Sequence, residues 1–421
     1  MIAGLARMPV AVASRQPDDT SVEQWATWFW NAFLPGWIDR ASDREAGGFF
    51  DSLDKDGLPD PAAPKTVLAQ SRLLFTFAHL ALLTGDPLHH DAAKRAYDFL
   101  SHFRGRSGLY ARAVARDGQA TGEDADAVAR SYDQSFVILA LATWERLAPD
   151  DTIKRELDAC WDAIQAILTD PNTGLLLEDD TIKMPSAPEA PPRAQNPHMH
   201  LYEAALQAFE MTGEPLWLDR AATVRQIALD HFLDRDSGTI IEFLAPDLSF
   251  LSGKEGIRRE VGHQCEWAWL LDREARLGGS NEVRAIAQEL TAFADAHGFA
   301  TSGLMSGAAL DAVSADAAWR CETFLLWPQT EAIKSDTARF LAGDEQSGKR
   351  ARSRVKLMFD RYFDGRAAFA NQLDRGGAVL WPDAMSRLVY HLVLALTEGA
   401  GAGLWPGPTR YKNGGVQPCS I

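Results

Sequence analysis

The residues Val261-Gly262-His263-Gln264-Cys265-Glu266-Trp267-Ala268-Trp269-Leu270-Leu271 decide the fold of this chain. They predict a helix that is apolar almost all round, and such a helix is buried on every side. A second pattern follows downstream, where apolar residues recur every three or four positions at Val283, Ile286, Leu290 and Phe293. That spacing predicts an amphipathic helix with one face in water.

The same two patterns recur along the chain, and glycines mark the repeat. These glycines lie 60 to 66 residues apart, at Gly48, Gly108, Gly174, Gly238, Gly303 and Gly365. A period of this size indicates a repeated supersecondary unit. In each unit an amphipathic helix precedes the glycine, a short strand or hairpin follows it, and an apolar helix comes last.

Six buried helices wrapped by six amphipathic helices form a closed all-α architecture, the (α/α)6 barrel, with short β-hairpins in the connecting loops. The alternative is an open α-solenoid, whose inner helices more often keep a polar concave face. We expect one barrel domain over residues 19–405. A disordered or loosely packed N-terminus is expected over 1–18 and a C-terminal tail over 406–421.

Composition and charge exclude several classes of function. The 421 residues are 46% hydrophobic and carry a formal net charge of −16, so neither nucleic acid nor an anionic membrane is an expected partner. No apolar run reaches the roughly 18 residues that span a bilayer, and the first residues lack the apolar core of a signal peptide. The four cysteines are far apart and fit free thiols in a reducing cytoplasm: Cys160, Cys265, Cys321 and Cys419.

The repeat also predicts that polar residues from different units lie at one level of the barrel. Counting in units from His263 reaches residues on four other inner helices: Arg72, His200, Trp327 and His391. Two of these helices repeat the pattern His-x-x-Glu, at His200-Glu203 and His263-Glu266, which places a carboxylate beside each imidazole. Because burying so many polar groups is costly, we expect them to form a functional site.

The residue types favour a sugar over a metal or a bound cofactor. Arg72 and Trp327 take positions that a di-metal centre would give to carboxylates, and His198 and His200 point to different helix faces. The sequence has no phosphate-binding loop, dinucleotide fingerprint or nucleophile elbow. Indoles, carboxylates and a guanidinium suit a sugar, and histidine can move protons near neutrality without a cofactor.

Several stretches resemble the signatures of the N-acylglucosamine 2-epimerase superfamily. They lie at 196–204, 262–271, 327–331, 70–72 and 390–392, and the resemblance runs from about Gly47 to Ala395. It implies the (α/α)6 barrel and a cofactor-free epimerase or aldose–ketose isomerase.

The resemblance also implies a role for each position. His391 would take the C2 proton of the open-chain sugar, and His263, oriented by Glu266, would assist ring opening as the second acid or base. Arg72 would stabilise the cis-enediol(ate). The remaining substrate-binding residues are expected to be Asn196, His200, Glu203, Glu266 and Trp327, with Trp327 stacked on the sugar.

An aldose–ketose isomerase that interconverts D-mannose, or a close relative, and D-fructose is the preferred activity. It rests on a resemblance of residues 37–40, 47–50 and 70–72 to bacterial mannose-type isomerases. The alternatives are a sugar 2-epimerase, a mannose-6-phosphate isomerase, a glycoside hydrolase using Asp133 and Glu266, and a non-catalytic interaction protein.

The charge of the substrate and the oligomeric state are further expectations. The charge of −16 favours a neutral monosaccharide, and a phosphate would need loop cations such as Lys183, Arg193, Arg258 and Arg259. Arg387, just before His391, departs from the pattern of the superfamily and bears on the acceptor side of the pocket. A monomer or homodimer is expected, with Trp25 or Trp28 on the outer ring as a dimer face.

Overall fold

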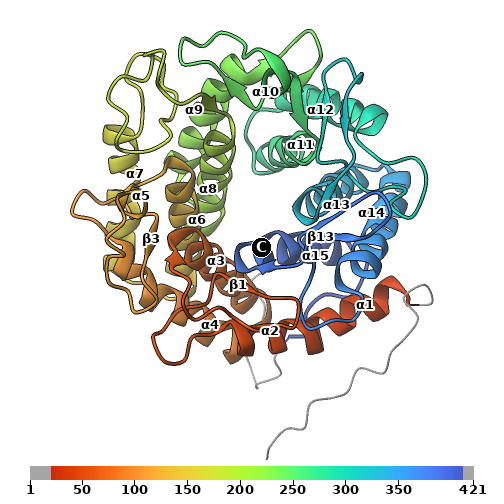
Figure 1. The fold of residues 1–421 in the computed structure, drawn as a ribbon, viewed down its shortest axis with the longest axis horizontal. Helices are drawn as coiled ribbons and strands as arrows, with labels where there is room; N and C mark the ends of the chain where they lie inside the picture. Colours follow the sequence, from red (N-terminus) through yellow and green to blue (C-terminus); the bar gives the residue numbers. More distant parts are fainter. Residues whose placement is uncertain (1–19, 411–421) are drawn as a thin grey trace, which may run out of the picture.

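The computed structural model describes residues 20–410 and arranges their helices in two concentric rings (Figure 1). The inner helices are α3 (Val67–Thr84), α6 (Ser131–Leu147), α8 (Asn196–Thr212), α11 (Val261–Arg276), α13 (Leu326–Leu341) and α15 (Val389–Gly401). The outer ring contains α1 (Val22–Trp28), α2 (Leu34–Ala41), α4 (Pro87–Leu100), α7 (Asp151–Ile167), α9 (Pro215–Phe232), α12 (Val283–His297) and α14 (Glu345–Met358). The π-helical turn η2 (Phe29–Phe33) joins α1 to α2, and η4 (Phe359–Phe363) follows α14.

The two rings differ in burial as the sequence predicted. Helix α11 buries residues on every face, and its Trp267 and Trp269 are at most 1% exposed. Helix α12 buries mainly a stripe that includes Val283, Leu290 and Phe293. The predicted (α/α)6 barrel is confirmed, because α15 packs against α3 and closes the ring.

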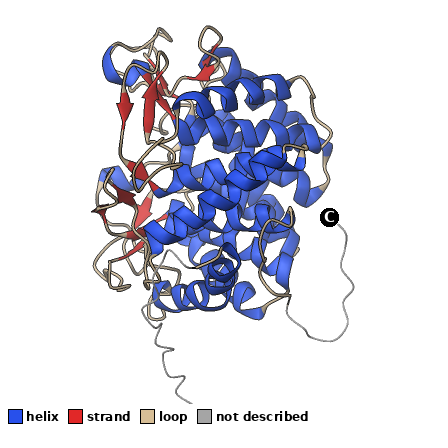
Figure 2. Ribbon diagram, turned by 90° about the vertical axis from the view of Figure 1, so that its right-hand side faces the viewer, coloured by secondary structure: helices blue, strands red, loops and turns tan. Residues whose placement is uncertain are grey.

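Short antiparallel strands gather at one end of the barrel (Figure 2). The two-stranded pairs are β1 (Ser52–Leu53) with β14 (Ala384–Met385), β2 (Lys65–Thr66) with β3 (Ala113–Val114), β4 (Arg193–Ala194) with β7 (Phe243–Leu244), and β5 (Leu233–Asp234) with β6 (Thr239–Ile240). The three-stranded sheets are β8 (Arg258–Glu260), β9 (Ala312–Ser314) and β10 (Arg320–Cys321), and β11 (Phe324–Leu325), β12 (Gln372–Leu373) and β13 (Val379–Trp381). The short helices α5 (Asp124–Ala127), α10 (Gly253–Ile257), η3 (Ser101–Phe103) and η5 (Ser386–Leu388) also lie in connecting segments.

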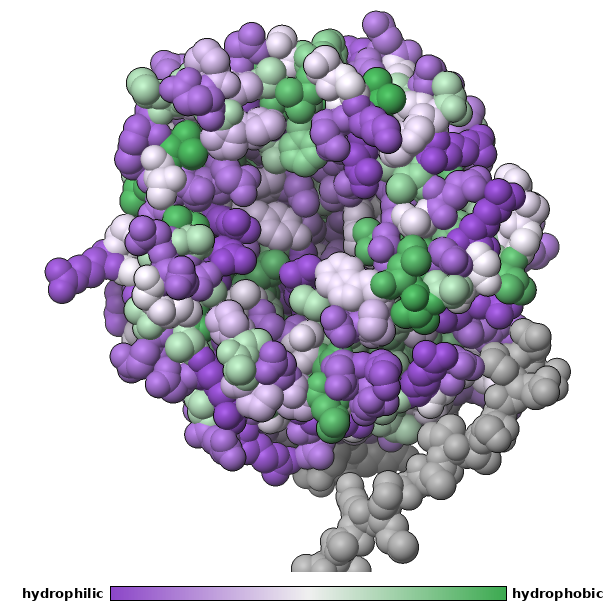
Figure 3. Space-filling model, in the orientation of Figure 1, coloured by the Kyte–Doolittle hydropathy of each residue, from purple (hydrophilic) through white to green (hydrophobic). Residues whose placement is uncertain are grey.

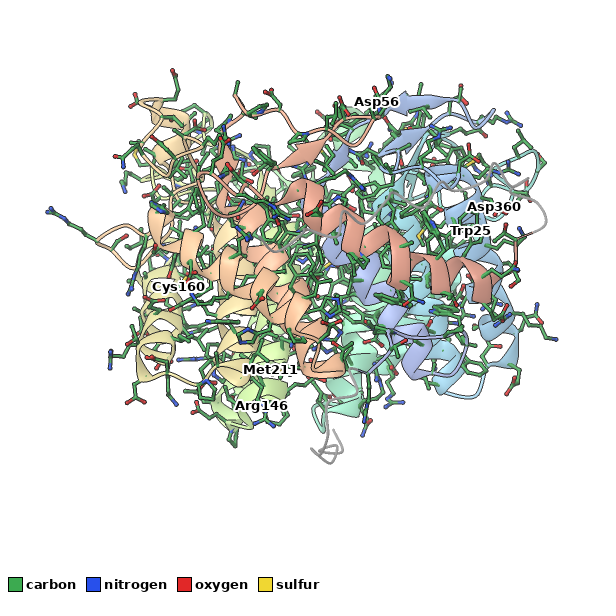
Figure 4. The ribbon with its side chains drawn as sticks, turned by 90° about the horizontal axis from the view of Figure 1, so that it is seen from below. Trp25, Asp56, Arg146, Cys160, Met211 and Asp360 are labelled. Carbon is green, nitrogen blue, oxygen red and sulfur yellow. The ribbon has the colours of Figure 1, made fainter. Side chains whose placement is uncertain are left out.

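Several of these strand pairs tie one unit to another. The strand before α3 pairs with β3 of the following unit, the strand before α11 pairs with β9, and β14 before α15 returns to β1 of the first unit. Each pair therefore fixes the height at which an inner helix begins. Connections at the other end, where Figure 4 labels Arg146 and Met211, are short, such as Gly85-Asp86 between α3 and α4.

A buried amide or imidazole near the start of five inner helices binds the backbone of the preceding hairpin. The Gln264 side chain accepts from the N–H of Ile240 and donates to its carbonyl, and Gln70, Gln134 and Gln329 do the same at Phe49, Tyr110 and Ala309. His198 takes this place in α8, where its Nε2 accepts from the N–H of Leu176 at 2.8 Å. We call these five side chains the hairpin clamps. They satisfy backbone groups that burial would otherwise leave unpaired.

Of the two outer-ring tryptophans expected at a dimer face, Trp28 is half-buried and Trp25 is buried. Trp25 is 6% exposed, stacks on Phe359 and donates its indole N–H to Asp360 at 2.8 Å. Figure 4 shows Trp25 and Asp360 side by side. The prediction for Trp25 was wrong because α1 packs on α14 as the outer ring closes.

Other expectations concern the ends, the thiols and the apolar segments. The predicted N-terminal lead-in over 1–18 and most of the predicted tail lie outside the described residues, as does Cys419. Cys160 and Cys265 are free and buried, and Cys321 is free and partly exposed. Among the described helices only α3 is long and apolar enough to cross a membrane, and most of it is buried inside the barrel.

Candidate active site

A cavity of about 490 Å³ opens at the strand-bearing end of the barrel. Figure 3 looks onto this end and shows the surface hollowed near its middle. Seven of the eight site residues expected from the sequence line the cavity: Arg72, Asn196, His200, His263, Glu266, Trp327 and His391. The eighth, Glu203, lies behind His200 and contacts it.

The site residues lie at two depths along the inner helices, whereas the repeat predicted a single level. The hairpin clamps define the true register, and Arg72, His200, Glu266 and Glu331 each follow a clamp by two residues. His263 and Trp327 precede their clamps and lie nearer the helix N-termini. Counting from His263 by glycine spacing therefore misplaced Arg72 and His200 by about one helical turn.

His391 is held as a neutral imidazole. Its Nδ1 lies 2.8 Å from Oε1 of Glu331, and its Nε2 lies 3.3 Å from Nη1 of Arg72. A guanidinium only donates hydrogen bonds, so Nε2 carries the lone pair and Nδ1–H donates to Glu331. Burial and the positive charges of Arg72 and Lys334 keep the pKa of His391 well below its usual value.

His263 is held in the opposite protonation state. Its Nδ1 lies 2.7 Å from Oε2 of Glu242 and 3.4 Å from Oε2 of Glu260. Burial opposes the charged imidazolium, but Glu242 and Glu260 outweigh burial and raise the pKa of His263 to about 9. The expected orientation of His263 by Glu266 was wrong, because Glu266 lies a turn deeper and its carboxylate accepts no hydrogen bond from His263.

The predicted pair of His200 and Glu203 is confirmed at 3.0 Å between Nδ1 and Oε2. Tyr390 donates its hydroxyl to the other oxygen of Glu203. Burial lowers the pKa of His200 to about 4, so this imidazole is neutral. The pKa of Glu203 is lowered to about 2, because contacts with His200, Lys334 and Tyr390 outweigh burial.

A buried lysine compensates the carboxylates beneath the cavity. Lys334 is 0% exposed, and its Nζ lies 2.6 Å from Glu331, 3.7 Å from Glu266 and 3.8 Å from the ring centre of Trp269. Burial and the neighbouring Glu331 raise the pKa of Glu266 well above its usual value, which favours a protonated carboxyl. Both Glu266 oxygens are buried without a hydrogen-bond partner among the described residues, and Glu266 lines the cavity. A substrate hydroxyl would satisfy them.

Arg72 reaches the cavity with neutral partners only. It is 2% exposed, its Nη2 donates to the Tyr132 hydroxyl at 2.7 Å, and its Nη1 faces His391. Its guanidinium also lies over the rings of Phe136 and Tyr390, at 4.0 and 5.0 Å. No carboxylate among residues 20–410 pairs with it, so its charge is available to an oxyanion in the cavity.

Trp327 lies between the two histidines that face the cavity. Its ring centre is 4.9 Å from that of His263 and 6.1 Å from that of His391. Gly262 beside His263 leaves the space that the indole occupies, since a Cβ there would lie 2.3 Å from the ring. Asn196, the first residue of α8, has a buried Oδ1 with no partner among the described residues. Both side chains are placed to contact a ligand.

Three side-chain groups bring carboxylate and imidazole atoms within 4.8 Å of one another. They are His200, Glu203 and Glu266; Glu242, Glu260 and His263; and Glu266, Glu331 and His391. The Lys334 ammonium already pairs with Glu331, the raised pKa of Glu266 favours its neutral form, and His263 and Arg258 pair with Glu242 and Glu260. The carboxylates therefore have counter-ions from the chain itself.

Other residues of the site were not expected from the sequence. Glu242, Glu331 and Tyr132 contact the expected residues directly, and Lys334 lies beneath them. Glu331 follows Trp327 within a recognised stretch, and this spacing was the only signal for it. Glu242 belongs to a loop one residue before β7, 21 residues from its partner His263, so no helical spacing could reveal it.

The chain is similar to several known proteins. The sequence profile described as N-acylglucosamine 2-epimerase (GlcNAc 2-epimerase) matches residues 48–395. A mannose-6-phosphate isomerase of Rhizobium meliloti (strain 1021) is 28% identical over 391 residues, which cover 89% of this chain and 95% of that protein.

Two solved structures have the same fold. A D-mannose isomerase superposes with a TM-score of 0.78 and 22% identity, covering 89% of this chain and 97% of that chain. A cellobiose 2-epimerase from Bacillus thermoamylovorans B4167 superposes with a TM-score of 0.78 and 17% identity, covering 90% and 98%.

Proposed function

Because the chain belongs to the N-acylglucosamine 2-epimerase family of sugar isomerases and epimerases, we propose that it is an aldose–ketose isomerase. The proposed reaction interconverts a mannose-configured aldose and the corresponding fructose-configured ketose without a cofactor. It proceeds through a cis-enediol(ate).

The observation that carries the proposal is the opposite protonation of the two histidines that face one cavity. The pKa of His391 is lowered, and its Nε2 carries a lone pair that faces the Arg72 guanidinium. Burial opposes the charged form of His263, but Glu242 and Glu260 outweigh burial and raise the pKa of His263 to about 9. Environments that push two pKa values apart assign a base and an acid. Sugar isomerisation needs both groups, because a base removes a proton from carbon and an acid protonates a sugar oxygen.

Each step uses a group already described. The His263 imidazolium donates a proton to the ring oxygen, and the anomeric hydroxyl returns a proton to His263 as the sugar opens to its C1 aldehyde. His391 Nε2 then takes the proton from C2. Electrons from the C2–H bond move toward the C1 carbonyl, where the Arg72 guanidinium stabilises the developing negative charge. His391 returns the proton to C1 while the proton of the C2 hydroxyl passes to O1, so that C2 becomes the ketose carbonyl and O1 becomes a hydroxyl. Trp327 covers one face of the sugar, while Asn196, His200 and Glu266 accept or donate hydrogen bonds to hydroxyls.

The comparison with a known relative favours isomerisation over epimerisation at C2. Epimerisation would need His263 to protonate C2 from the opposite face. The relative from Rhizobium meliloti that matches this chain over nearly its whole length is named an isomerase.

A glycoside hydrolase at Asp133 and Glu266 is less well supported. Hydrolysis by two carboxyl groups needs one of them ionised as nucleophile or base. Burial raises the pKa of Asp133 to about 7, and burial together with Glu331 raises the pKa of Glu266. Both carboxyls are therefore shifted toward the protonated form.

Product analysis tests the proposal. The purified protein is incubated separately with mannose, glucose, fructose, N-acetylmannosamine and mannose 6-phosphate, and the products are separated by chromatography. We expect an aldose–ketose pair at equilibrium, and loss of turnover in His391→Asn. Formation of a C2 epimer without ketose would replace isomerase by epimerase, and release of sugar only from glycosides would contradict both.

A further inference from the structure

Two arginines line the cavity without a role in the proposed proton transfers. Arg130 is the residue before α6, and Arg387 lies in the short helix η5 immediately before α15. Helix α3, which carries Arg72, packs against both α6 and α15. Three guanidiniums therefore come from three neighbouring positions of the inner ring and face one cavity.

These two arginines lack the partners that neutralise other cations of the strand-bearing end. Among residues 20–410, neither the Arg130 nor the Arg387 side chain forms a hydrogen bond or ion pair, and the buried Nε of Arg130 is unsatisfied. The four loop cations expected to hold a phosphate are occupied elsewhere. Arg193 pairs with Asp170, Arg258 with Glu260 and Arg259 with Asp234, and Lys183 donates to the carbonyl of Asp180.

The nearby carboxyl groups do not remove this positive charge. Asp133 and Glu178 line the cavity close to Arg130, but neither forms an ion pair with it. Burial raises the pKa of Asp133 to about 7 against the influence of Arg130, Arg112 and Arg72, so this carboxyl is often protonated at neutral pH. Burial and the like charge of Arg72 lower the pKa of Arg387. Like charges that crowd one wall of a cavity are relieved when an anion binds.

The wall around His263 is balanced in charge. Glu242 lies in the loop before β7 and Glu260 on β8, and His263 and Arg258 pair with them. An anionic group of a ligand is therefore attracted to the two arginines rather than to this wall.

We propose that Arg130 and Arg387 form an oxyanion subsite, and that the sugar isomerised in this cavity carries a phosphate or carboxylate substituent away from its reacting carbons. This inference rests on the proposed isomerase function. It reverses the preference for a neutral sugar that the net charge of −16 suggested, because local charge at a cavity outweighs the mean charge of the surface.

Paired substrates test the subsite. The kcat/KM values for mannose, mannose 6-phosphate and mannuronate are measured for the wild type, Arg130→Gln and Arg387→Gln, with Lys183→Gln as an exposed-cation control. We expect the wild type to prefer one anionic sugar, and the ratio of its kcat/KM to that of mannose to fall about 10–100-fold in each arginine variant. Preference for mannose 6-phosphate identifies the oxyanion as a phosphate, and preference for mannuronate identifies a carboxylate.

Other outcomes separate the two proposals. If mannose is isomerised at least as well as both anionic sugars, or if the ratio is unchanged in both arginine variants, the subsite is wrong and the isomerase stands. If no sugar is turned over, the isomerase fails. Calorimetry then decides the subsite alone, since tighter binding of mannose 6-phosphate or mannuronate than of mannose, lost in Arg387→Gln, supports it and equal binding overturns it.

Discussion

Lys334 Nζ lies 2.6 Å from Oε2 of Glu331 inside the barrel, where neither side chain reaches solvent. Glu331 in turn accepts from His391, so a buried ion pair sets the charge behind the proposed base. Charged groups face His391 from several inner helices: Arg72 on α3, Glu203 and His200 on α8, Glu266 on α11, and Lys334 and Glu331 on α13. Lys334 is the cation beneath this group.

Replacing Lys334 by methionine should move the acid limb of the kcat/KM profile to higher pH. Burial, Arg72 and Lys334 lower the pKa of His391, so loss of the ammonium raises this pKa and keeps the base protonated over a wider range. The free energy of unfolding should also fall by about 3 kcal/mol or more, because carboxylates are left uncompensated. Rate profiles against pH check the first effect and thermal unfolding the second.

The matched control is Thr337→Val, a buried substitution on the same helix that changes no charge. It should leave the acid limb in place. A Lys334→Met enzyme that is less stable but has an unshifted acid limb would show that the lysine only supports packing.

Replacing Glu242 by glutamine should move the alkaline limb of kcat/KM to lower pH. Burial lowers the pKa of His263, but the charges of Glu242 and Glu260 outweigh burial and raise this pKa to about 9. The amide keeps the shape of the carboxylate but removes its charge, so His263 loses its proton earlier as the pH rises. Glu260→Gln should act in the same direction but more weakly, since Glu260 lies 3.4 Å from Nδ1 against 2.7 Å for Glu242. An alkaline limb unaffected by either variant would remove His263 from the acid role.

His263 should also make the stability of the folded protein depend on pH. Its folded pKa of about 9 exceeds the unfolded value of about 6.5, so its contribution is fully present below pH 6.5 and is lost as the pH rises through 9. The difference in unfolding temperature between the wild type and Glu242→Gln should therefore be larger at pH 6 than at pH 10. A difference that is equal at both pH values would contradict this linkage.

Replacing Gly262 by alanine should raise KM about tenfold with a smaller effect on kcat. The added Cβ would lie 2.3 Å from the Trp327 ring and force the indole out of its place between the two histidines. Overpacking of this kind costs about 1–3 kcal/mol. Gly401→Ala, in α15 with open space around the position, is the control and should leave KM unchanged. Initial rates over a range of sugar concentrations decide between them.

Replacing Gln134 by methionine should destabilise the barrel by roughly 2–5 kcal/mol, because the clamp satisfies both backbone groups of Tyr110. Its side chain points to the hairpin and lies outside the cavity lining. Gln165→Met, exposed on α7, should change the unfolding temperature little. Equal unfolding temperatures for the two variants would show that the hairpin clamps contribute nothing to stability.

The sequence predicted the barrel well because its signals are local. Glycine spacing and helical periodicity are properties of short segments, and they gave the number and kind of helices. The depth of each residue was less accessible, because units differ in length by a few residues and a shift of three moves a side chain by one turn. The correct register of the units was present in the sequence but was not recognised there. It is marked by the clamp glutamines Gln70, Gln134, Gln264 and Gln329.

The partners of the site residues could not be predicted in the same way. Glu242 and His263 meet through the pairing of loops and strands, and Lys334 is buried only because three carboxylates from different helices surround it. Lysine and arginine usually lie at the protein surface, so the sequence did not predict that Lys334 and the two subsite arginines belong to the site. The one signal was that Arg387 departs from the pattern of the superfamily.

The most direct test of the proposed chemistry follows the hydrogen at C2. A mannose-configured aldose deuterated at C2, carrying whichever substituent the protein turns over best, is incubated with the wild type and with His391→Asn. Nuclear magnetic resonance then follows the label. We predict that the wild type moves deuterium from C2 to C1 of the ketose or to solvent, and that His391→Asn slows this loss about a thousandfold. Loss of the C2 deuterium at the wild-type rate in His391→Asn would contradict the assignment of His391 as the base.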